Sequence, residues 1–160
     1  MDIGTGTGIM GVIMGLYGAT RVAMSDISNI AAKNSQENLR KFKLENVCSV
    51  VQGDLFEKIT EKADFIVINQ PFFGDKPPEN DTIYASMLDS GDLIKRFLKQ
   101  APKHLNKKGR IMMPFYSKAG ETNNPAIQAP KFGFTVNTVF RVIAKTGIQK
   151  GELTIHELYK

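Results

Sequence analysis

The chain contains little cysteine and histidine: Cys48 is its only cysteine, and His104 and His156 are its only histidines. A lone cysteine excludes a disulfide framework and a cysteine metal cluster, and it favours a cytoplasmic setting. Because Cys48 lies between Val47 and Val50, we expect it in a buried strand and not at a reactive centre. The two histidines stand apart, with surface or strand roles expected, so the sequence indicates no metal site.

Long apolar runs and internal repeats are also missing. No stretch approaches the roughly 20 apolar residues that span a bilayer, and no signal peptide precedes the first expected strand. A hydrophobic fraction of 42% and a charged fraction of 23% are typical of a globular protein. At 160 residues, the chain is expected to form a single domain, residues 1–160, with no membrane partner.

The net charge of +5 is distributed unevenly. Residues 1–68 carry seven Lys/Arg and eight Asp/Glu, a balance of −1, whereas residues 69–160 carry fourteen and eight, a balance of +6. The excess thus lies in the half that we expect to face the substrate, which is compatible with an anionic partner such as RNA. A solvated helix face is the alternative, because much of the excess comes from Lys95, Arg96, Lys99, Lys103, Lys107 and Lys108.

The first eight residues, Met1-Asp2-Ile3-Gly4-Thr5-Gly6-Thr7-Gly8, have the pattern of a nucleotide-binding loop. Glycines at this density allow a tight turn whose backbone approaches a ligand closely, because no Cβ stands in the way. A helical pattern begins at Ile9 and directs its free N–H groups back toward the loop. A glycine turn without any ligand is the simpler alternative.

Two cofactors fit such a loop. Residues 6–11 match the dinucleotide pattern G-x-G-x-x-G, which would indicate NAD. The alternative pattern, Asp-x-Gly-x-Gly-x-Gly beginning at Asp2, resembles the opening motif of class I S-adenosylmethionine (SAM) methyltransferases. An acid beside the loop suits a cationic, amine-bearing cofactor better than it suits a phosphate.

Past the loop, helical and strand-like segments alternate. We expect helices at 9–16, 29–42 and 93–105, with Ser28 as a cap, and strands at 21–25, 47–51, 65–68 and 110–113. The run 65–68 is continuously apolar, as expected for a strand covered on both faces. Residues 75–90 predict a surface segment, and 134–145 with 152–158 predict an antiparallel hairpin. This pattern predicts an α/β fold with a doubly wound, mostly parallel sheet.

Polar side chains stand at the ends of the first four expected strands: Asp2, Asp26, Asp54 and Asn69. In doubly wound sheets the ligand lies outside the carboxyl ends of the strands. Asp26 lies where a carboxylate would accept both ribose hydroxyls, and Asp54 lies where an acceptor would take the adenine amino group. Any one of these acids could equally be a helix cap or turn residue, but that alternative explains their joint placement less well.

The segment Asn69-Gln70-Pro71-Phe72 resembles the Asn-Pro-Pro-Tyr/Phe motif of methyltransferases that modify amide or exocyclic amine nitrogens, such as the release-factor glutamine and adenine-N6 enzymes. The resemblance runs from the loop to the final hairpin, and Gly91-Asp92-Leu93 is also similar to the glutamine enzymes. It implies a Rossmann-like, mostly parallel seven-stranded sheet with an antiparallel C-terminal hairpin.

The resemblance also implies roles for particular residues. SAM would be bound by the residues Asp2, Gly4, Thr5, Gly6, Gly8, Asp26, Ile27, Asp54, Leu55 and Asn69. The catalytic segment would be Asn69, Gln70, Pro71 and Phe72. In such enzymes the Asn side-chain oxygen and the next main-chain carbonyl accept the two N–H bonds of the target nitrogen. Phe72 would stack on the flat target group, and neither a general base nor a metal is required.

Two features depart from the family pattern. Gln70 stands where the family has its first proline, which keeps the carbonyl acceptor but loosens the turn. The first strand is truncated, and the usual N-terminal substrate-recognition segment is missing from residues 1–160. We therefore expect a SAM-dependent N-methyltransferase acting on a protein glutamine or a nucleic-acid base, with a small-molecule amine ranked behind. An NAD-binding oxidoreductase and a SAM-binding fragment without independent activity remain the alternatives.

Overall fold

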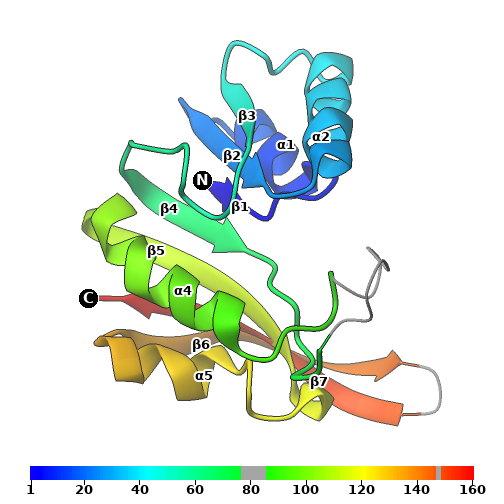
Figure 1. The fold of residues 1–160 in the computed structure, drawn as a ribbon, viewed down its shortest axis with the longest axis vertical. Coiled ribbons are helices and arrows are strands. Elements are labelled where there is room, and N and C mark those ends of the chain that lie inside the picture. The colour runs from blue at the N-terminus through cyan, green and yellow to red at the C-terminus, as the bar shows by residue number, and fades with distance from the viewer. Residues whose placement is uncertain (77–85, 147–148) are drawn as a thin grey trace.

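The computed structural model describes residues 1–76, 86–146 and 149–160. The strands are β1 (Asp2–Ile3), β2 (Val22–Asp26), β3 (Cys48–Gln52), β4 (Ala63–Ile68), β5 (Leu105–Tyr116), β6 (Thr135–Thr146) and β7 (Gln149–Tyr159). The helices are α1 (Ile9–Leu16), α2 (Asn29–Lys41), α4 (Asp92–Gln100) and α5 (Pro125–Gln128), with 3-10 turns at Ala101–His104, Ser117–Ala119 and Ala129–Phe132. Figure 1 shows how these elements follow one another along the chain.

All seven strands belong to one sheet with the order β3-β2-β1-β4-β5-β7-β6. Strands β1 to β5 are parallel, whereas β7 is antiparallel to both β5 and β6. This arrangement confirms the predicted doubly wound, mostly parallel sheet with an antiparallel C-terminal hairpin and a short first strand. The strand order reverses between β1 and β4, so their carboxyl ends form the switch point where ligands bind in such sheets.

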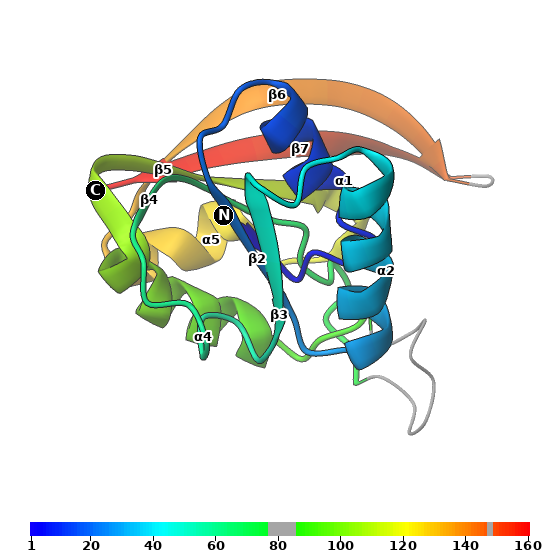
Figure 2. The same ribbon diagram turned by 90° about the horizontal axis from the view of Figure 1, so that it is seen from above.

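Two hydrophobic clusters lie on opposite faces of the sheet, because successive strand residues point to opposite sides. On one face, Val22 and Met24 of β2 pack with Val12 of α1 and Leu39 of α2. On the other face, Ile3 of β1 packs with α4 and with the segment between β3 and β4. Figure 2 shows α1 and α2 beside β2 and β3, and α4 and α5 beside the other half of the sheet.

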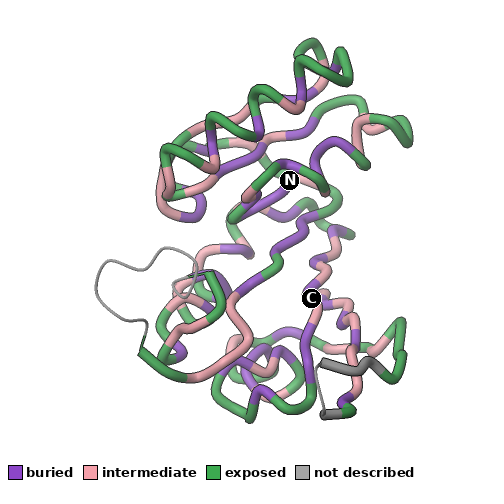
Figure 3. The backbone as a smooth tube through the Cα atoms, turned by 90° about the vertical axis from the view of Figure 1, so that its right-hand side faces the viewer, coloured by how far each residue is buried: buried purple, intermediate pink, exposed green. Residues whose placement is uncertain are grey.

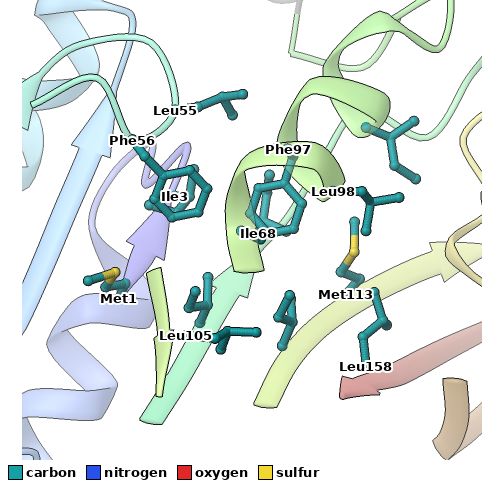
Figure 4. Packing of buried hydrophobic residues seen from close by; sticks show 14 of the residues in the cluster. Met1, Ile3, Leu55, Phe56, Ile68, Phe97, Leu98, Leu105, Met113 and Leu158 are labelled. Carbon is teal, nitrogen blue, oxygen red and sulfur yellow. The ribbon is translucent and has the colours of Figure 1, made fainter. Parts of the chain in front are cut away.

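The larger cluster lies beneath α4. Ile94, Phe97 and Leu98 of α4 are fully buried there, and Phe56 stacks on Phe97 with ring centroids 5.6 Å apart. Figure 4 shows Phe56, Phe97 and Leu98 near residues of β1, β4, β5 and β7, and Figure 3 shows buried segments running through the middle of the molecule. Each large apolar side chain buried in this way contributes about 1.5–3 kcal/mol, so α4 is firmly held against the sheet.

One local expectation is wrong, and a second holds for only part of its strand. The helix predicted to reach Leu105 ends at Gln100, because Pro102 cannot donate the hydrogen bond that would continue it, and Leu105 instead begins β5 beside Ala63. Strand β4 is covered on both faces at Ile66, Val67 and Ile68, which are at most 4% exposed, but Phe65 is 37% exposed, because the helices of its face, α1 and α2, lie over β2 and β3.

Other local expectations are confirmed. The Ser28 side chain accepts a hydrogen bond from the Ala31 amide at 3.3 Å and caps α2. Cys48 is buried in β3. The predicted surface segment 75–90 includes residues 77–85, and the hairpin turn includes 147–148; both of these stretches lie outside the described residues. In the part of the chain that is described, no helix has the length and apolar character needed to cross a bilayer.

His156 on β7 is buried between two threonines, with ring nitrogens 3.1 Å from Thr138 Oγ1 and 3.0 Å from Thr154 Oγ1. Burial lowers the pKa of His156, nearby Arg141 lowers it further, and Glu152 opposes the change. The stability that the neutral ring contributes is therefore complete above the unfolded pKa of about 6.5, and it is lost as the pH falls from there through the folded value.

We expect the His156→Gln variant to lose less stability on acidification than the wild-type protein, because glutamine does not titrate. Urea unfolding at about pH 7.5 and about pH 5.5 measures the loss in each protein. The carboxylates that also titrate are common to both proteins and cancel in the comparison. An equal loss in both would show that His156 does not contribute to the acid sensitivity.

Candidate functional site

The glycine loop follows β1 and is held from inside by Asp2. Its carboxylate is 3% exposed, and Oδ2 accepts hydrogen bonds from Thr5 Oγ1 at 2.5 Å and from the Gly11 amide at 3.0 Å. Burial raises the pKa of Asp2, while these two hydrogen bonds oppose the rise. Asp2 therefore connects the loop to the first turn of α1, and its side chain does not reach the open surface.

Gly4, Gly6 and Gly8 all have positive φ, at +67°, +58° and +83°. A Cβ on Gly4 or Gly6 would meet no atom within 4 Å, so open space adjoins the loop at these two positions. A Cβ on Gly8 would lie 3.0 Å from Ser35 Oγ and 3.2 Å from Met24 Cε. Gly8 thus allows the close packing of the loop on α2 and β2.

Gly8→Ala is expected to destabilise the protein more than Gly18→Ala. Gly18 has φ of +92° and open space around its Cα, so alanine there costs only the left-handed conformation, about 1–2 kcal/mol. At Gly8 the crowding against Ser35 adds about 1–3 kcal/mol. Urea unfolding of the two variants measures the difference, and equal losses would mean that Ser35 and Met24 move aside freely.

Asp26 at the end of β2 faces the loop. Its Oδ2 accepts a hydrogen bond from the Gly6 amide at 2.8 Å, and its Oδ1 accepts one from the Ser28 amide at 2.8 Å. A carboxylate oxygen has two lone pairs, so each oxygen keeps capacity for a ligand hydroxyl. The half-buried Asp26 is therefore held rigidly with both oxygens able to accept further bonds.

Asp54 follows β3 and is engaged by a residue that the sequence did not indicate. Arg96 of α4 forms an ion pair with Asp54 through Nη1 and a second with Asp92 through Nε at 2.6 Å. Both side chains of the first pair are about two-fifths exposed, so the pair adds little to stability. Its effect is local, because Arg96 holds one oxygen of the carboxylate predicted to accept the adenine amino group.

Asn69 follows β4 and is exposed, and its side-chain amide makes no hydrogen bond to the residues within 1–76, 86–146 and 149–160. Phe72, three residues on, is half-buried and meets Phe115 edge to face, with centroids 6.0 Å apart and planes at 70°. The amide of Asn69 is thus available to a ligand, beside a phenyl ring held in place by β5.

Two adjoining cavities meet at this turn. The first, of about 80 Å³, is lined by Gly4, Asp26, Ile27, Gly53, Asp54, Leu55, Ile68, Asn69, Gln70, Pro71 and Leu93. The second, of about 260 Å³, is lined by Asn69, Gln70, Phe72, Phe73, Ser86 and Met87. Neither alone reaches the usual range of about 300–1,000 Å³ for a ligand site, but they share Asn69 and Gln70.

The predicted site residues separate into two groups. Gly4, Asp26, Ile27, Asp54, Leu55, Asn69, Gln70, Pro71 and Phe72 line the two cavities. The other predicted residues do not line either cavity: Asp2 lies in β1, and Thr5, Gly6 and Gly8 lie in the glycine loop. A cavity of about 290 Å³ at the opposite edge of the sheet contains none of the predicted site residues, so size alone does not identify the site.

Part of the positive charge of the second half lies away from these cavities. Lys103, Lys107 and Lys108 lie at the start of β5, where Leu105 pairs with Ala63, at the edge of the sheet opposite Asn69. These three lysines therefore do not border the two cavities. Among the described residues, no group of His, Cys, Asp and Glu side chains is arranged to hold a metal ion.

Comparison with known proteins extends these observations. Residues 1–133 match the family described as "Methyltransferase small domain". A Methanocaldococcus jannaschii protein, provisionally described as a protein N5-glutamine methyltransferase, is 32% identical over 127 residues, or 76% of this chain and 63% of that protein. The ribosomal RNA small subunit methyltransferase C of Haemophilus ducreyi is 32% identical over 112 residues, or 69% of this chain and 30% of that protein.

The crystal structure of the ribosomal protein L11 methylase from Lactobacillus delbrueckii subsp. bulgaricus has the same fold. Its TM-score is 0.65 at 20% identity, covering 96% of this chain and 67% of that one. The present chain spans less than two thirds of the length of either relative named above. Since the family match extends from the glycine loop through α5, the predicted resemblance is confirmed, and the chain belongs to the family of small methyltransferase domains.

Proposed function

We propose that this chain is a SAM-dependent methyltransferase domain that methylates a planar nitrogen, and that the acceptor is the side-chain amide of a protein glutamine. The observation that carries the proposal is the position of Asn69. Its exposed amide has no partner among the described residues, and it stands where the two cavities meet, one beside the glycine loop and one beside Phe72.

The first cavity has the chemistry that SAM requires. Open space adjoins Gly4, which lines this cavity, and Asp26 has lone pairs left for the ribose hydroxyls. Ile27, which is 68% exposed, offers an apolar surface for a flat base. Asp54 would accept from the adenine amino group through the oxygen that Arg96 does not hold. Asp2, Thr5 and Gly8 would act indirectly by shaping the loop.

The residues that line the first cavity would hold SAM, which would supply an activated methyl group, and the target nitrogen would take this methyl as its bond to sulfur breaks. The amide of a glutamine is a poor nucleophile because its lone pair is delocalised. Asn69 Oδ1 and the main-chain carbonyl of Gln70 would accept its two N–H bonds and direct the lone pair, while Phe72 would stack on its plane. The methylated nitrogen would then lose one proton to water, and no general base is needed because an amide that carries this extra proton is a strong acid.

Two observations favour a protein acceptor over RNA. Gly91-Asp92-Leu93 resembles the glutamine enzymes in particular, whereas the Asn69-Gln70-Pro71-Phe72 pattern is shared with the adenine-N6 enzymes. Lys103, Lys107 and Lys108 lie at the amino ends of β4 and β5, away from Asn69, so these three lysines are not placed to bind a phosphate backbone at the site. We also propose a cytoplasmic location, which the lone cysteine favours.

Two measurements test the proposal. Calorimetric titration with SAM, S-adenosylhomocysteine and NAD should show binding of the first two and none of NAD. Incubation with labelled SAM and a cell extract should then label material that resists ribonuclease and is lost on proteolysis. Ribonuclease-sensitive label would make RNA the acceptor. Binding of NAD alone would favour an oxidoreductase, and binding of SAM without transfer would favour a domain that is inactive by itself.

A further inference from the structure

The side chain of Gln70 is turned inward, unlike that of its neighbour Asn69. Gln70 is 3% exposed, and its Nε2 donates a hydrogen bond of 2.6 Å to the main-chain carbonyl of Asn123. Asn123 lies in the loop that follows β5, more than fifty residues further along the chain. The side chain of Gln70 therefore connects the turn after β4 to a distant loop.

Asn123 continues the connection. It is fully buried, and its Nδ2 donates hydrogen bonds to the main-chain carbonyl of Phe73 at 3.2 Å and to that of Asp89 at 2.7 Å. One side chain thus reaches both the turn after β4 and the segment that precedes α4. With Gln70, it fastens the two ends of the segment 70–73 to the same loop.

The main chain reinforces this arrangement. The Phe73 amide donates to the Met87 carbonyl at 3.1 Å, and the Asp89 amide donates to the Phe73 carbonyl at 2.9 Å. Asp89 then accepts from the amides of Gly91 and Leu93 and so begins α4. Because α4 is fixed against the sheet by its buried face, the turn 69–73 is anchored to a rigid element through Asp89 and Asn123.

We propose that the side chains of Gln70 and Asn123 are positioning residues that set the geometry of the turn carrying the Asn69 amide and the Gln70 carbonyl. In the related motif a proline ring stiffens the turn at the place of Gln70. Here two buried amides supply the stiffness through tertiary hydrogen bonds. The inference rests on the proposed function, because it concerns the two acceptors that would orient the target nitrogen.

Small displacements at such a site have large effects on rate. A misplacement of about 1 Å can lower an enzymatic rate by about a hundredfold. Loss of these hydrogen bonds of Gln70 and Asn123, which we call the Gln70–Asn123 tie, should therefore lower kcat far more than it weakens SAM binding. Gln70 lines the first cavity, but Asp26 and the glycine loop have no hydrogen bond to Gln70 or Asn123 within the described ranges.

Gln70→Met is the most informative variant. Methionine has a similar size, so packing is kept, and the change removes the donor together with Gln70 Oε1, which has no hydrogen-bond partner among the described residues. Thermal stability should stay close to that of the wild type, whereas kcat for methyl transfer should fall about tenfold or more with SAM Kd changed less than twofold. Asn123→Ala should produce the same pattern in kcat.

Gln128→Met is the matched control. Gln128 is a buried glutamine whose Nε2 donates to the Thr122 carbonyl at 2.9 Å, in the same loop as Asn123, but it makes no hydrogen bond to the described part of the turn, 69–73. Its replacement should leave kcat within about twofold of the wild type. An equal loss of kcat in Gln70→Met and Gln128→Met would overturn the proposal, because both would then act only through the stability of the loop.

Hydrogen exchange separates this inference from the proposed function, because it needs no SAM and no acceptor. The amides of Phe73 and Asp89 should exchange about tenfold faster in Gln70→Met and Asn123→Ala, and at the wild-type rate in Gln128→Met. If the Phe73 and Asp89 amides exchange at the wild-type rate in Gln70→Met, the Gln70–Asn123 tie does not hold the turn, even if kcat falls. If the variants exchange faster but the wild-type protein transfers no methyl group, the proposed function is refuted. The structural role of the Gln70–Asn123 tie is then still established.

Discussion

Asp26→Ala is expected to weaken SAM binding by about 1–3 kcal/mol, or about 5–150-fold, the range for leaving buried polar groups without partners. Both carboxylate oxygens already accept backbone amides, from Gly6 and from Ser28 at 2.8 Å each. The rigid carboxylate would accept the ribose hydroxyls with its remaining lone pairs. Calorimetric titration of the variant with SAM measures the loss.

A matched control is Asp64→Ala, which removes an exposed carboxylate from the same sheet. Asp64 accepts a hydrogen bond from Asn106 Nδ2 at 2.7 Å and lies near the amino end of β4, away from both cavities. This variant should bind SAM as tightly as the wild type. A similar loss in both variants would mean that net charge, and not a ribose contact, governs the affinity.

Loosening of the loop and loss of a ribose contact can also be told apart. An S-adenosylhomocysteine analogue without ribose hydroxyls should bind the wild type more weakly than the parent compound does. In Asp26→Ala the two compounds should bind alike, since the partner of the hydroxyls is gone. If the variant still discriminates between them as the wild type does, the ribose lies elsewhere.

Much of the fold could be predicted because local patterns and chain connectivity agree. The alternation of apolar runs with amphipathic segments specifies parallel strands and crossover helices, and the turn composition of the last segment specifies a hairpin. What local patterns do not contain is the partner of each strand. β5 begins at Leu105, because Ala63 of β4 offers a neighbour there, and Phe65 is exposed, because the helices of its face lie over other strands.

The candidate site was predictable where it depends on strand ends. Asp26, Asp54 and Asn69 each follow a strand of one parallel sheet, and the fold brings all three to one cavity. The direction of a side chain is harder to predict. Asp2 also belongs to a strand end, but the alternation of β1 turns it inward toward Thr5 and Gly11, whereas Ile3 faces the other side.

Asn123 could not have been found from its own neighbourhood. The sequence Asn-Asn-Pro is typical of a helix start, and Asn124 does cap α5 by accepting from the Ala126 amide at 2.9 Å. The bonds of Asn123 to Phe73 and Asp89 depend on how the loop packs against two other segments. Arg96 is a similar case, because its periodic position in α4 predicts only an exposed side chain, while the fold places it beside Asp54.

Substitution of Asn69 should lower the rate of methyl transfer without weakening SAM binding. We expect Asn69→Ala to leave SAM affinity within about twofold of the wild type and to lower methyl transfer at least about a hundredfold, the scale for removing one aligned polar group from an active site. The Asn69 amide is exposed and makes no hydrogen bond to the described residues, so its removal leaves no buried group unpaired and should not unfold the turn. Calorimetry and a labelled-SAM assay measure the two quantities on the same preparation.

Phe72→Ala provides the contrast, because its ring lines only the second cavity and rests edge-on against Phe115. Stacking is lost in the ground state and the transition state alike, so this variant should raise KM for the acceptor more than it lowers kcat. Asn137→Ala, on β6 and away from both cavities, controls for the loss of an exposed asparagine and should change neither quantity.

The opposite result at Asn69 would have a definite meaning. If Asn69→Ala loses SAM binding, and transfer falls only in proportion, the residue belongs to the cofactor pocket and does not hold the target nitrogen. The first cavity includes Asn69, so this outcome is physically open. Nitrogen specificity would then rest on the Gln70 carbonyl alone, and one acceptor cannot fix both N–H bonds of a planar amide. A transfer rate that falls while SAM remains bound is therefore the result that assigns Asn69 to the acceptor.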